Sequence, residues 1–453
     1  MAARAGPLTY QLASWTVDSQ WVRNVPRRSI PAAILVAAVA WSLPVGRSLA
    51  ASGPFPNSLS DHRLNGNMTQ FYSYPIPDDA TALALANTHS ILVSNAYLMH
   101  GYGAEMQAAN PSLLIMQYYD GVYSKETKFP ASWYLRDAAG NQLINEASLY
   151  LMDPMSTEPY TEGSVTYAGW RGWVTKQCQA LLAGSPGLFN GGCWLDDIGS
   201  NPVNGRVKDV VTGQTEPPLN PATGQPYTNH EWYQITGPFA RKVRADVGGY
   251  SIDNALVAPG SFYAGSEGTR QFLTYIDGGM AEGWLRNARD PVIPYPVPLK
   301  WKQAVQMVMD TNRSGHAIQC MVKLWSTATP DQIKSWRLFA FATYLMGNQG
   351  AAYFQFSSAS LPATPWADMT DPLFDVPIGS PTDSYAKVGQ YAKAGGAYYK
   401  RVYTGGLVLI NPNQTGNTVN VQLGGTYYLP DGTAVTQVSL PQDTAQIVTT
   451  TPP

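Results

Sequence analysis

The chain has 453 residues, which is too long for one small domain and long enough to bury a large hydrophobic core. Its formal net charge is -2, from 29 basic and 31 acidic residues, and no basic run or stripe is present, so the sequence argues against a nucleic-acid partner. Only 13% of the residues are charged, whereas Trp (13) and Tyr (27) are plentiful, and this composition favours a secreted protein with a neutral substrate. We expect most of these aromatic residues to lie in the core.

The first 50 residues have the pattern of a targeting segment. Arg23, Arg27 and Arg28 precede an apolar stretch at residues 30–43, and small residues at 48–50 offer a cleavage site. The apolar stretch is short for a membrane span, which needs about 20 residues. We therefore expect a cleaved signal peptide and a secreted, extracellular or cell-envelope protein, with a retained N-terminal anchor as the alternative.

After a linker at 51–66 that is rich in Pro, Ser and Asn, residues 67–396 alternate short apolar runs with longer helical patterns. That alternation is typical of a parallel sheet with crossover helices. Strands are predicted at 71–74, 90–95, 113–119, 192–196, 256–258 or the run just before it, 278–281, 317–322 and 351–354. Helices are predicted at patterns such as 167–182, 232–247, 301–312 and 331–346. Eight strands in this rhythm predict an α/β fold, the (β/α)8 TIM barrel.

Two segments interrupt or follow the alternation. A polar stretch at 201–230 comes directly after the fourth strand, and we expect it to lie over the top of the barrel near Asp196. Residues 397–453 change in character, because short β-like runs alternate with turn signals. They predict a small C-terminal antiparallel β-sandwich domain, with runs at 399–403, 407–411, 419–423, 426–429 and 446–448.

The three cysteines match no zinc or redox motif. Cys178 and Cys193 could form one disulfide between a helix and the fourth strand, which an exported protein would permit. Two buried free thiols are the alternative. Cys320 lies in an apolar run and is expected to be packed and inert.

Carboxylates at strand ends are the main candidates for chemistry. A glycosidic bond is cut by two of them: one protonates the leaving oxygen, and the other acts as nucleophile or activates water. In a barrel the two come from different strand ends, so they need no close spacing in the sequence. The candidates are Asp120, Asp196, Asp197, Asp277 and Glu282. Asp277 precedes its strand, which favours a structural role, whereas Glu282 follows its strand, where a catalytic group belongs.

Strand alternation selects among them. Trp194 and Asp196 share one face of the fourth strand, and the opposite face carries Cys193, Leu195 and Asp197. If Cys193 and Leu195 pack outward on the helices, Asp196 points into the barrel mouth. Asp197 would then support Asp196 or cap the following turn, and it remains the alternative catalyst.

Other polar and aromatic residues at strand ends are candidates for substrate binding, since aromatic rings can stack on sugar faces. They are Tyr119, Asp120, Trp194, Asn254, Trp284, Lys323, Trp325 and Gln355. Each also has a plain structural interpretation. A lone Asp before a loop is more often a turn or cap residue than a catalyst, by about three to one, and the aromatic residues could be core. The functional interpretation gains weight because several candidates fall at the same end of successive strands.

The order of these segments resembles the uncharacterised glycosyl-hydrolase-like barrel families, which are related to amylase-type and polygalactosaminidase-like barrels. The matching motifs are GCWLDD at 192–197 and DGGMAEG at 277–283, with GGLVLINP at 405–412 similar to the start of the C-terminal β domain in such enzymes. The resemblance spans about 71–448. It implies Asp196 as nucleophile or base, with Asp197 as alternative, and Glu282 as proton donor. The chain departs from the amylase pattern because it has no evident His-Asp pair near the seventh strand.

Together these features predict a secreted glycoside hydrolase that uses Asp196 and Glu282 and needs neither a metal nor an organic cofactor. None of His62, His89, His100, His230 and His316 pairs at metal-ligand spacing. We expect a carbohydrate substrate, no membrane contact beyond the possible anchor, and a monomer. The alternative is a non-catalytic carbohydrate-binding or cell-surface protein on the same barrel, because a fold does not establish an activity.

Overall fold

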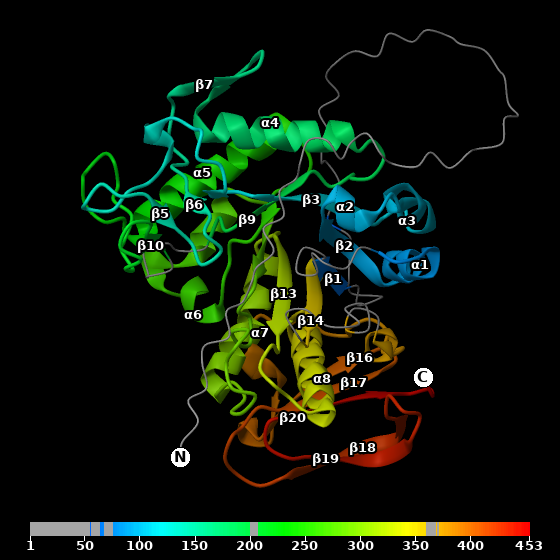
Figure 1. The fold of residues 1–453 in the computed structure, drawn as a ribbon. Helices are drawn as coiled ribbons and strands as arrows, with labels where there is room; N and C mark the ends of the chain where they lie inside the picture. The colour runs from blue at the N-terminus through cyan, green and yellow to red at the C-terminus, as the bar shows by residue number, and fades with distance from the viewer. Residues whose placement is uncertain (1–54, 56–63, 68–75, 200–206, 359–367, 369–370) are drawn as a thin grey trace, which may run out of the picture. The chain divides into compact units, whose positions relative to one another are not determined.

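The computed structural model describes residues 55, 64–67, 76–199, 207–358, 368 and 371–453, which belong to one compact unit, Ser48–Pro453 (Figure 1). The predicted targeting segment at 1–50 and the first predicted strand at 71–74 lie outside these described residues. None of the helices in the described part of the chain combines the length and the apolar character that a membrane span requires.

Eight parallel strands form the main sheet, in the order β11-β12-β13-β14-β1-β2-β3-β9. Of the eight strands in this sheet, β14 comes last along the chain and pairs with β1, which comes first, as in a barrel. Five of the predicted strands after the first match within one residue at each end, the strand predicted at 351–354 extends three residues further, and the run before 256–258 forms the short β11. The strands are β1 Leu64–Asn67, β2 His89–Ser94, β3 Leu114–Asp120, β9 Cys193–Asp196, β11 Ile252–Asp253, β12 Gly278–Ala281, β13 Ala317–Lys323 and β14 Ala352–Ser357.

Two details of this sheet correct the sequence prediction. First, β1 begins at Leu64, inside the predicted linker. The sequence did not predict this strand, because its residues LNGN include no β-branched or aromatic side chain. Second, the sheet is not a fully closed barrel, because no strand ladder joins β9 to β11. β11 has only two residues, and Gly248 and Gly249 before it turn the backbone with φ angles of 88° and 85°.

Helices follow the strands and cover the outside of the sheet. They are α1 Asp79–Thr88, α2 Ala96–Met99, α3 Gly103–Ala109, α4 Gly169–Gly184, α5 Asn229–Val247, α6 Pro259–Phe262, α7 Pro298–Arg313 and α8 Pro330–Gly347. The four helices expected from the sequence correspond to α4, α5, α7 and α8. Two of these begin with capping boxes, at Thr228 with Glu231 and at Thr329 with Gln332. In each box the side chain of one residue accepts a hydrogen bond from the backbone N–H of the other.

Apolar side chains fill both sides of the main sheet. One cluster lies on its inner face and combines residues of seven strands, namely Ile91, Val93, Met116, Trp194, Ile252, Met280, Ala317, Met321 and Tyr353. Larger clusters join the outer face to α4 and α5, and to α7 and α8. Burial on both faces explains why strands such as β2 and β13 have almost continuous apolar sequences rather than alternating ones.

An insertion between β3 and α4 was not predicted from the sequence. It contributes three strands of a small sheet with the order β10-β5-β6-β4, together with a hairpin of β7 and β8. Its strands are too short to give a periodic signal. They are β4 Tyr123–Ser124, β5 Leu143–Ile144, β6 Tyr150–Leu151, β7 Pro159–Glu162 and β8 Val165–Ala168, and β5 pairs with β10 Lys208–Asp209 from the polar stretch after β9.

The C-terminal residues form one antiparallel six-stranded sheet, in the order β15-β16-β17-β20-β18-β19, rather than the two sheets of a sandwich. The predicted runs 419–423 and 426–429 are parts of one strand, β18, and β19 was missed because polar residues interrupt its apolar ones. The strands are β15 Ala392–Lys393, β16 Tyr398–Tyr403, β17 Gly406–Asn411, β18 Val419–Tyr428, β19 Ala434–Leu440 and β20 Thr444–Thr449.

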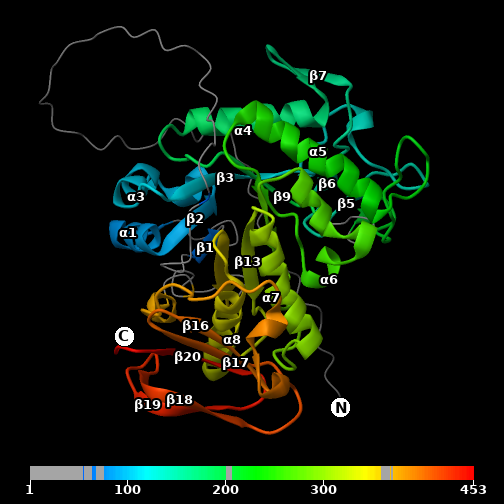
Figure 2. The same ribbon diagram turned by 180° about the vertical axis from the view of Figure 1, so that it is seen from behind.

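The C-terminal sheet packs on α8, and β17 and β20 lie beside this helix in both views (Figures 1 and 2). The buried guanidinium of Arg401 on β16 donates to the backbone oxygens of Leu345, Met346 and Asn348, where α8 ends. Positive charge at a helix C-terminus is favourable because the last carbonyls there have no partner within the helix. This contact fixes the sheet to the end of α8.

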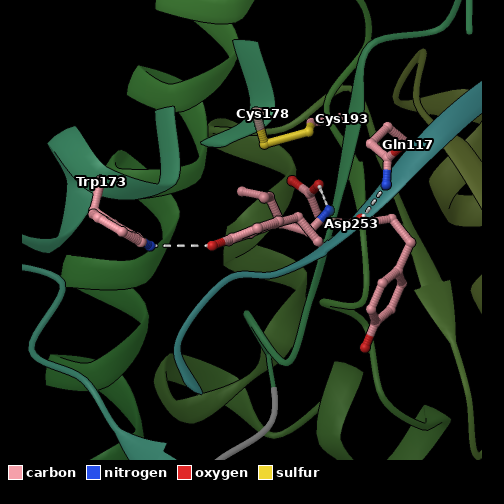
Figure 3. Close-up of a disulfide and its surroundings, with 8 residues drawn as sticks. Gln117, Trp173, Cys178, Cys193 and Asp253 are labelled. Atoms are coloured by element: carbon pink, nitrogen blue, oxygen red, sulfur yellow. Dashed lines mark hydrogen bonds between the residues drawn. A yellow bond between two sulfur atoms is a disulfide. The ribbon is translucent and has the colours of Figure 1, made fainter. Parts of the chain in front are cut away.

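A disulfide joins Cys178 of α4 to Cys193 of β9, with the two Cα atoms 6.1 Å apart (Figure 3). Of the two alternatives left open by the sequence, the structure therefore has the cross-link. Cys320 is buried and free, and burial raises the pKa of its thiol well above the ordinary value. The cross-link ties the helix that follows β3 to the strand that carries Asp196.

Removing the disulfide should destabilise the protein. Closing a loop of this length restricts the unfolded chain by about 3 kcal/mol. We therefore expect Cys178→Ala with Cys193→Ala to lower the urea midpoint of unfolding, and reduction of the wild type to have the same effect. Cys320→Ala, which leaves the disulfide in place, is the control for the loss of a thiol. An unchanged midpoint in the double variant would contradict the prediction.

Candidate active site

Polar side chains gather where the parallel strands of the main sheet end. Asp120 ends β3, Asp196 ends β9, Asn254 follows β11, Glu282 follows β12 and Lys323 ends β13. Because these strands run in parallel, their carboxyl ends lie at the same edge of the sheet. The structure therefore brings together residues that are far apart in the sequence.

The carboxylate of Asp196 accepts three hydrogen bonds. Tyr118 OH donates to Oδ2 at 2.8 Å, while Asn254 Nδ2 and the backbone N–H of Asp197 both donate to Oδ1 at 2.8 Å. Both carboxylate oxygens of Asp196 are thus held by fixed donors. This environment suits a group that acts as a nucleophile or base.

Asn254 connects the two predicted catalytic residues. Its Nδ2 lies 2.8 Å from Asp196 Oδ1 and 3.0 Å from Glu282 Oε2, so one amide group donates to both carboxylates. The two acceptor oxygens share this nitrogen and are consequently less than about 6 Å apart, a spacing that glycosidases with a covalent intermediate use. The Asn254 side chain is almost fully buried, whereas the Glu282 side chain is 34% exposed.

Lys323 is the charged partner of Glu282. Its Nζ forms an ion pair with Glu282 Oε1 and lies 4.6 Å from the centre of the Trp325 ring. The half-buried Trp325 is fixed in turn by a hydrogen bond from its Nε1 to Ser357 Oγ at 3.1 Å. An ammonium group beside Glu282 favours the ionised form of this carboxylate.

Side chains on the inner face of the sheet hold the donor to Asp196, Tyr118, in place. The Tyr118 ring stacks on Trp194 with centroids 5.7 Å apart, and Trp194 Nε1 donates to Gln319 Oε1 at 3.1 Å. Trp194 is fully buried, so it is a support for Tyr118 and not an exposed surface for sugar. Cys193 and Leu195 pack with the outer cluster of α4 and α5, which is the alternation that the sequence predicted.

Asp120 stands near Asp196 and Asp197, but its contacts are those of a turn. Its Oδ1 accepts the backbone N–H groups of Val122 and Tyr123 at 3.1 and 2.8 Å. Burial, followed by the nearby carboxylates of Asp197 and Asp196, raises the pKa of Asp120 well above its ordinary value. Asp197 has a left-handed backbone with φ of 58°, so the chain turns sharply after Asp196.

Three further predicted residues have different positions. Trp284 is buried among α7 and α8 and its Nε1 donates to Ala304 O, so it is a core residue rather than a sugar platform. Tyr119 lies on the face of β3 opposite to Tyr118, and its hydroxyl accepts a hydrogen bond from Nε1 of Trp173 in α4 at 3.2 Å. Gln355 is buried on the inner face of β14, the face that it shares with Tyr353.

Sequence reasoning missed Tyr118, although the signal was present. Tyr118 and Asp120 lie two residues apart on the same face of β3. The alternation of side chains along a strand, which selected Asp196 on β9, therefore also places Tyr118 on the inner face of the sheet. Within the described residues, no group of three or more His, Cys, Asp or Glu side chains is arranged to hold a metal ion.

Comparison with solved structures finds similarity to carbohydrate-active enzymes at low identity. A GH31 α-xylosidase from Xanthomonas citri has 11% identity and a TM-score of 0.42, and the match covers 88% of this chain and 47% of the xylosidase. A cycloalternan-degrading enzyme from Trueperella pyogenes has 10% identity and a TM-score of 0.37, with 85% of this chain and 61% of that enzyme covered. This chain thus spans about half the length of the xylosidase, and similarity at this level assigns neither a substrate nor a residue role.

A comparison with curated proteins finds no match. A family model described as hypothetical glycosyl hydrolase family 15 matches residues 104–407, which is more than half of the chain. The match includes Asp120, Asp196, Glu282 and Lys323, and it extends from the third helix to the second strand of the C-terminal hairpin formed by β16 and β17. The protein therefore belongs to the hypothetical glycosyl hydrolase family 15.

Proposed function

We propose that this protein is a secreted glycoside hydrolase that cleaves O-glycosidic bonds in a polysaccharide or oligosaccharide with Asp196 and Glu282. The observation that carries the proposal is the pair of hydrogen bonds from Asn254 Nδ2 to both carboxylates. Membership in a glycosyl hydrolase family supports the same class of reaction. The eight-stranded sheet would work as a (β/α)8 barrel whose strand ends form the active site.

The spacing of the two carboxylates favours a retaining mechanism. Retaining glycosidases hold their carboxyl groups about 5–5.5 Å apart, whereas inverting enzymes separate them by about 6.5–9.5 Å to admit a water molecule. Oxygens that contact one amide nitrogen at 2.8 and 3.0 Å fall on the retaining side. Asp196 would therefore attack the sugar directly.

The reaction would proceed in two displacements. In the first, an Asp196 oxygen bonds to the anomeric carbon while Glu282 gives its proton to the departing glycosidic oxygen, which leaves a glycosyl ester on Asp196. In the second, the ionised Glu282 takes a proton from water, the water oxygen bonds to the anomeric carbon and the ester bond breaks. Asp196 returns as a carboxylate and Glu282 regains its proton.

The ion pair with Lys323 sets a condition for this assignment. Glu282 must be protonated to act as an acid, but the ammonium group of Lys323 favours its ionised form. We infer that substrate binding moves Lys323 Nζ from Glu282 to a sugar hydroxyl, close to the Trp325 ring that would stack on the sugar. Release of the ion pair would then raise the fraction of protonated Glu282.

Asp196 and Glu282 are both accessible in part, which a neutral glycan substrate requires. The second candidate function is a non-catalytic carbohydrate-binding or cell-surface protein, and it is favoured if the ion pair between Lys323 and Glu282 persists in the sugar complex. We propose a monomer without a resident cofactor, exported by the segment at 1–50 or anchored by it in the cell envelope.

Substitution of either carboxylate tests the proposed function. The purified protein is assayed for released sugar on bacterial, fungal and plant polysaccharides. Glu282→Gln should lower the rate by about 10²–10⁴-fold, the range for a lost general acid, and Asp196→Asn should abolish turnover because no nucleophile remains. Glu105→Gln and Asp79→Asn, both exposed and outside the site, are the matched controls. Sugar binding without release, unchanged in both site variants, would assign the protein to the binding class.

Tyr118→Phe should slow the reaction without unfolding the protein. It keeps the ring that stacks on Trp194 and removes only the donor to Asp196 Oδ2. A hydrogen bond to a charged group contributes about 1.5–3 kcal/mol, so we expect a loss of about tenfold or more in kcat. Tyr134→Phe removes a comparable hydroxyl outside the site and should leave kcat unchanged. Equal rates in the two variants would show that Tyr118 does not support the nucleophile.

Lys323→Met should reveal which role Glu282 has. Loss of the cation favours the protonated form of Glu282, so the limb of the pH–rate profile that reports this carboxylate moves to higher pH. If Glu282 is the proton donor, the alkaline limb moves. Movement of the acidic limb instead would reverse the roles of Glu282 and Asp196. Lys302→Met on the outer helix α7 is the control for the loss of a lysine.

A further inference from the structure

The open seam between β9 and β11 contains a buried carboxyl group, Asp253. The two strands exchange few backbone hydrogen bonds here, with Asn254 N–H donating to Leu195 O at 2.9 Å. The N–H of Leu195 has no strand partner and donates to the side chain of Asp253 instead, at 3.0 Å from Oδ1. The carboxyl group thus occupies the place of a backbone acceptor.

Asp253 lies on the outer side of the seam. Its neighbour Ile252 belongs to the inner cluster, whereas Asp253 lines a small cavity with Leu195, Val243 and Arg244, between the sheet and α5. It is fully buried, and its second oxygen accepts a hydrogen bond from Ser251 Oγ at 2.6 Å. Figure 3 shows Asp253 near the disulfide of Cys193.

Both partners of this contact adjoin the proposed active site. Leu195 precedes Asp196, and Asp253 precedes Asn254, so the hydrogen bond on the outer face joins the residues immediately before the two whose side chains are hydrogen-bonded to each other. We propose that Asp253 is a positioning residue: its carboxyl group replaces the missing ladder between β9 and β11 and so fixes Asp196 against Asn254. The effect on catalysis rests on the proposed function, whereas the effect of Asp253 on the structure of the seam does not depend on any activity.

The charges around Asp253 come from two elements. Asp277, before β12, makes an ion pair with Arg244 of α5 at 3.0 Å and accepts the N–H of Ser251 at 2.9 Å. Burial raises the pKa of Asp253 to about 7. The hydrogen bonds from Ser251 and Leu195 oppose that shift, Asp277 adds to it and Arg244 opposes it. The folded protein therefore favours the protonated side chain.

This raised pKa fixes the sign of the pH dependence of stability. An unfolded Asp ionises near pH 4, so between about pH 4 and 7 the unfolded chain loses a proton that the folded chain retains. Asp253 therefore makes the fold less stable as the pH rises through that window. Asp253→Asn cannot titrate, so its melting temperature relative to the wild type should rise from pH 4 to 7 and stay level above pH 7.

Hydrogen exchange of the full chain tests the positioning role without a substrate. In Asp253→Ala the amide of Leu195 loses its acceptor, and we expect exchange in the peptides that cover 193–199 and 252–256 to accelerate about tenfold, the effect of one lost hydrogen bond. Peptides covering 317–323 and 352–357 on the other side of the sheet should not change. Asp253→Asn keeps an acceptor oxygen and should restore the wild-type rate. Asp153→Ala, which removes another buried carboxyl that accepts a backbone N–H, is the matched control.

The outcomes separate this inference from the proposed function. Unchanged exchange at the seam, or equal acceleration in all four peptides, would overturn the positioning role. If Asp253→Ala does not fold, Asp253→Glu, which keeps the carboxyl group but displaces its oxygens, takes its place with the same expectation. In an active enzyme, Asp253→Ala should lower kcat with little change in KM, and Asp253→Asn should restore kcat. An inactive wild type would refute the proposed function and leave the exchange result to decide the role of Asp253.

Discussion

The geometry of the candidate active site depends on one amide group, that of Asn254. Asn254 Nδ2 donates to Asp196 and to Glu282, so the two carboxylates are held at a fixed short distance although they lie on different strands. An amide between two carboxylates reduces the repulsion that would otherwise separate them, because its hydrogens carry partial positive charge toward both. The chemistry that we propose requires both of these carboxylates, and Asn254 sets their spacing.

The supports of Asp196 differ on the two sides of the sheet. On the inner face, the Tyr118 ring stacks on Trp194, and Trp194 is hydrogen-bonded to Gln319 of β13. On the outer face, the disulfide ties β9 to α4 and the carboxyl group of Asp253 accepts the N–H of Leu195. A strand that lacks a full ladder on one side is thus fixed by side chains, which leaves little freedom to the carboxylate of Asp196.

Much of the sheet, and the meeting of two candidate site residues at one edge of it, could be predicted from the sequence, because strands buried on both faces are apolar runs and polar residues mark their ends. Asp196 and Glu282 were found in this way. The short strand β1 and the insertion after β3 gave no periodic signal, since their residues obtain their structure from neighbours rather than from their own pattern. Trp284 was misplaced because a tryptophan at a strand end has the same sequence context whether it faces substrate or core.

The central claim is that Asp196 becomes covalently bonded to the sugar. A panel of activated 2-deoxy-2-fluoro glycosides, which slow the second displacement, would be incubated with the protein, and the labelled peptide would be identified by mass spectrometry. We predict one glycosyl adduct on the peptide that contains Asp196, absent in Asp196→Asn, together with a retained anomeric configuration of the product. An adduct on Glu282, or turnover with inversion and no adduct, would contradict the mechanism.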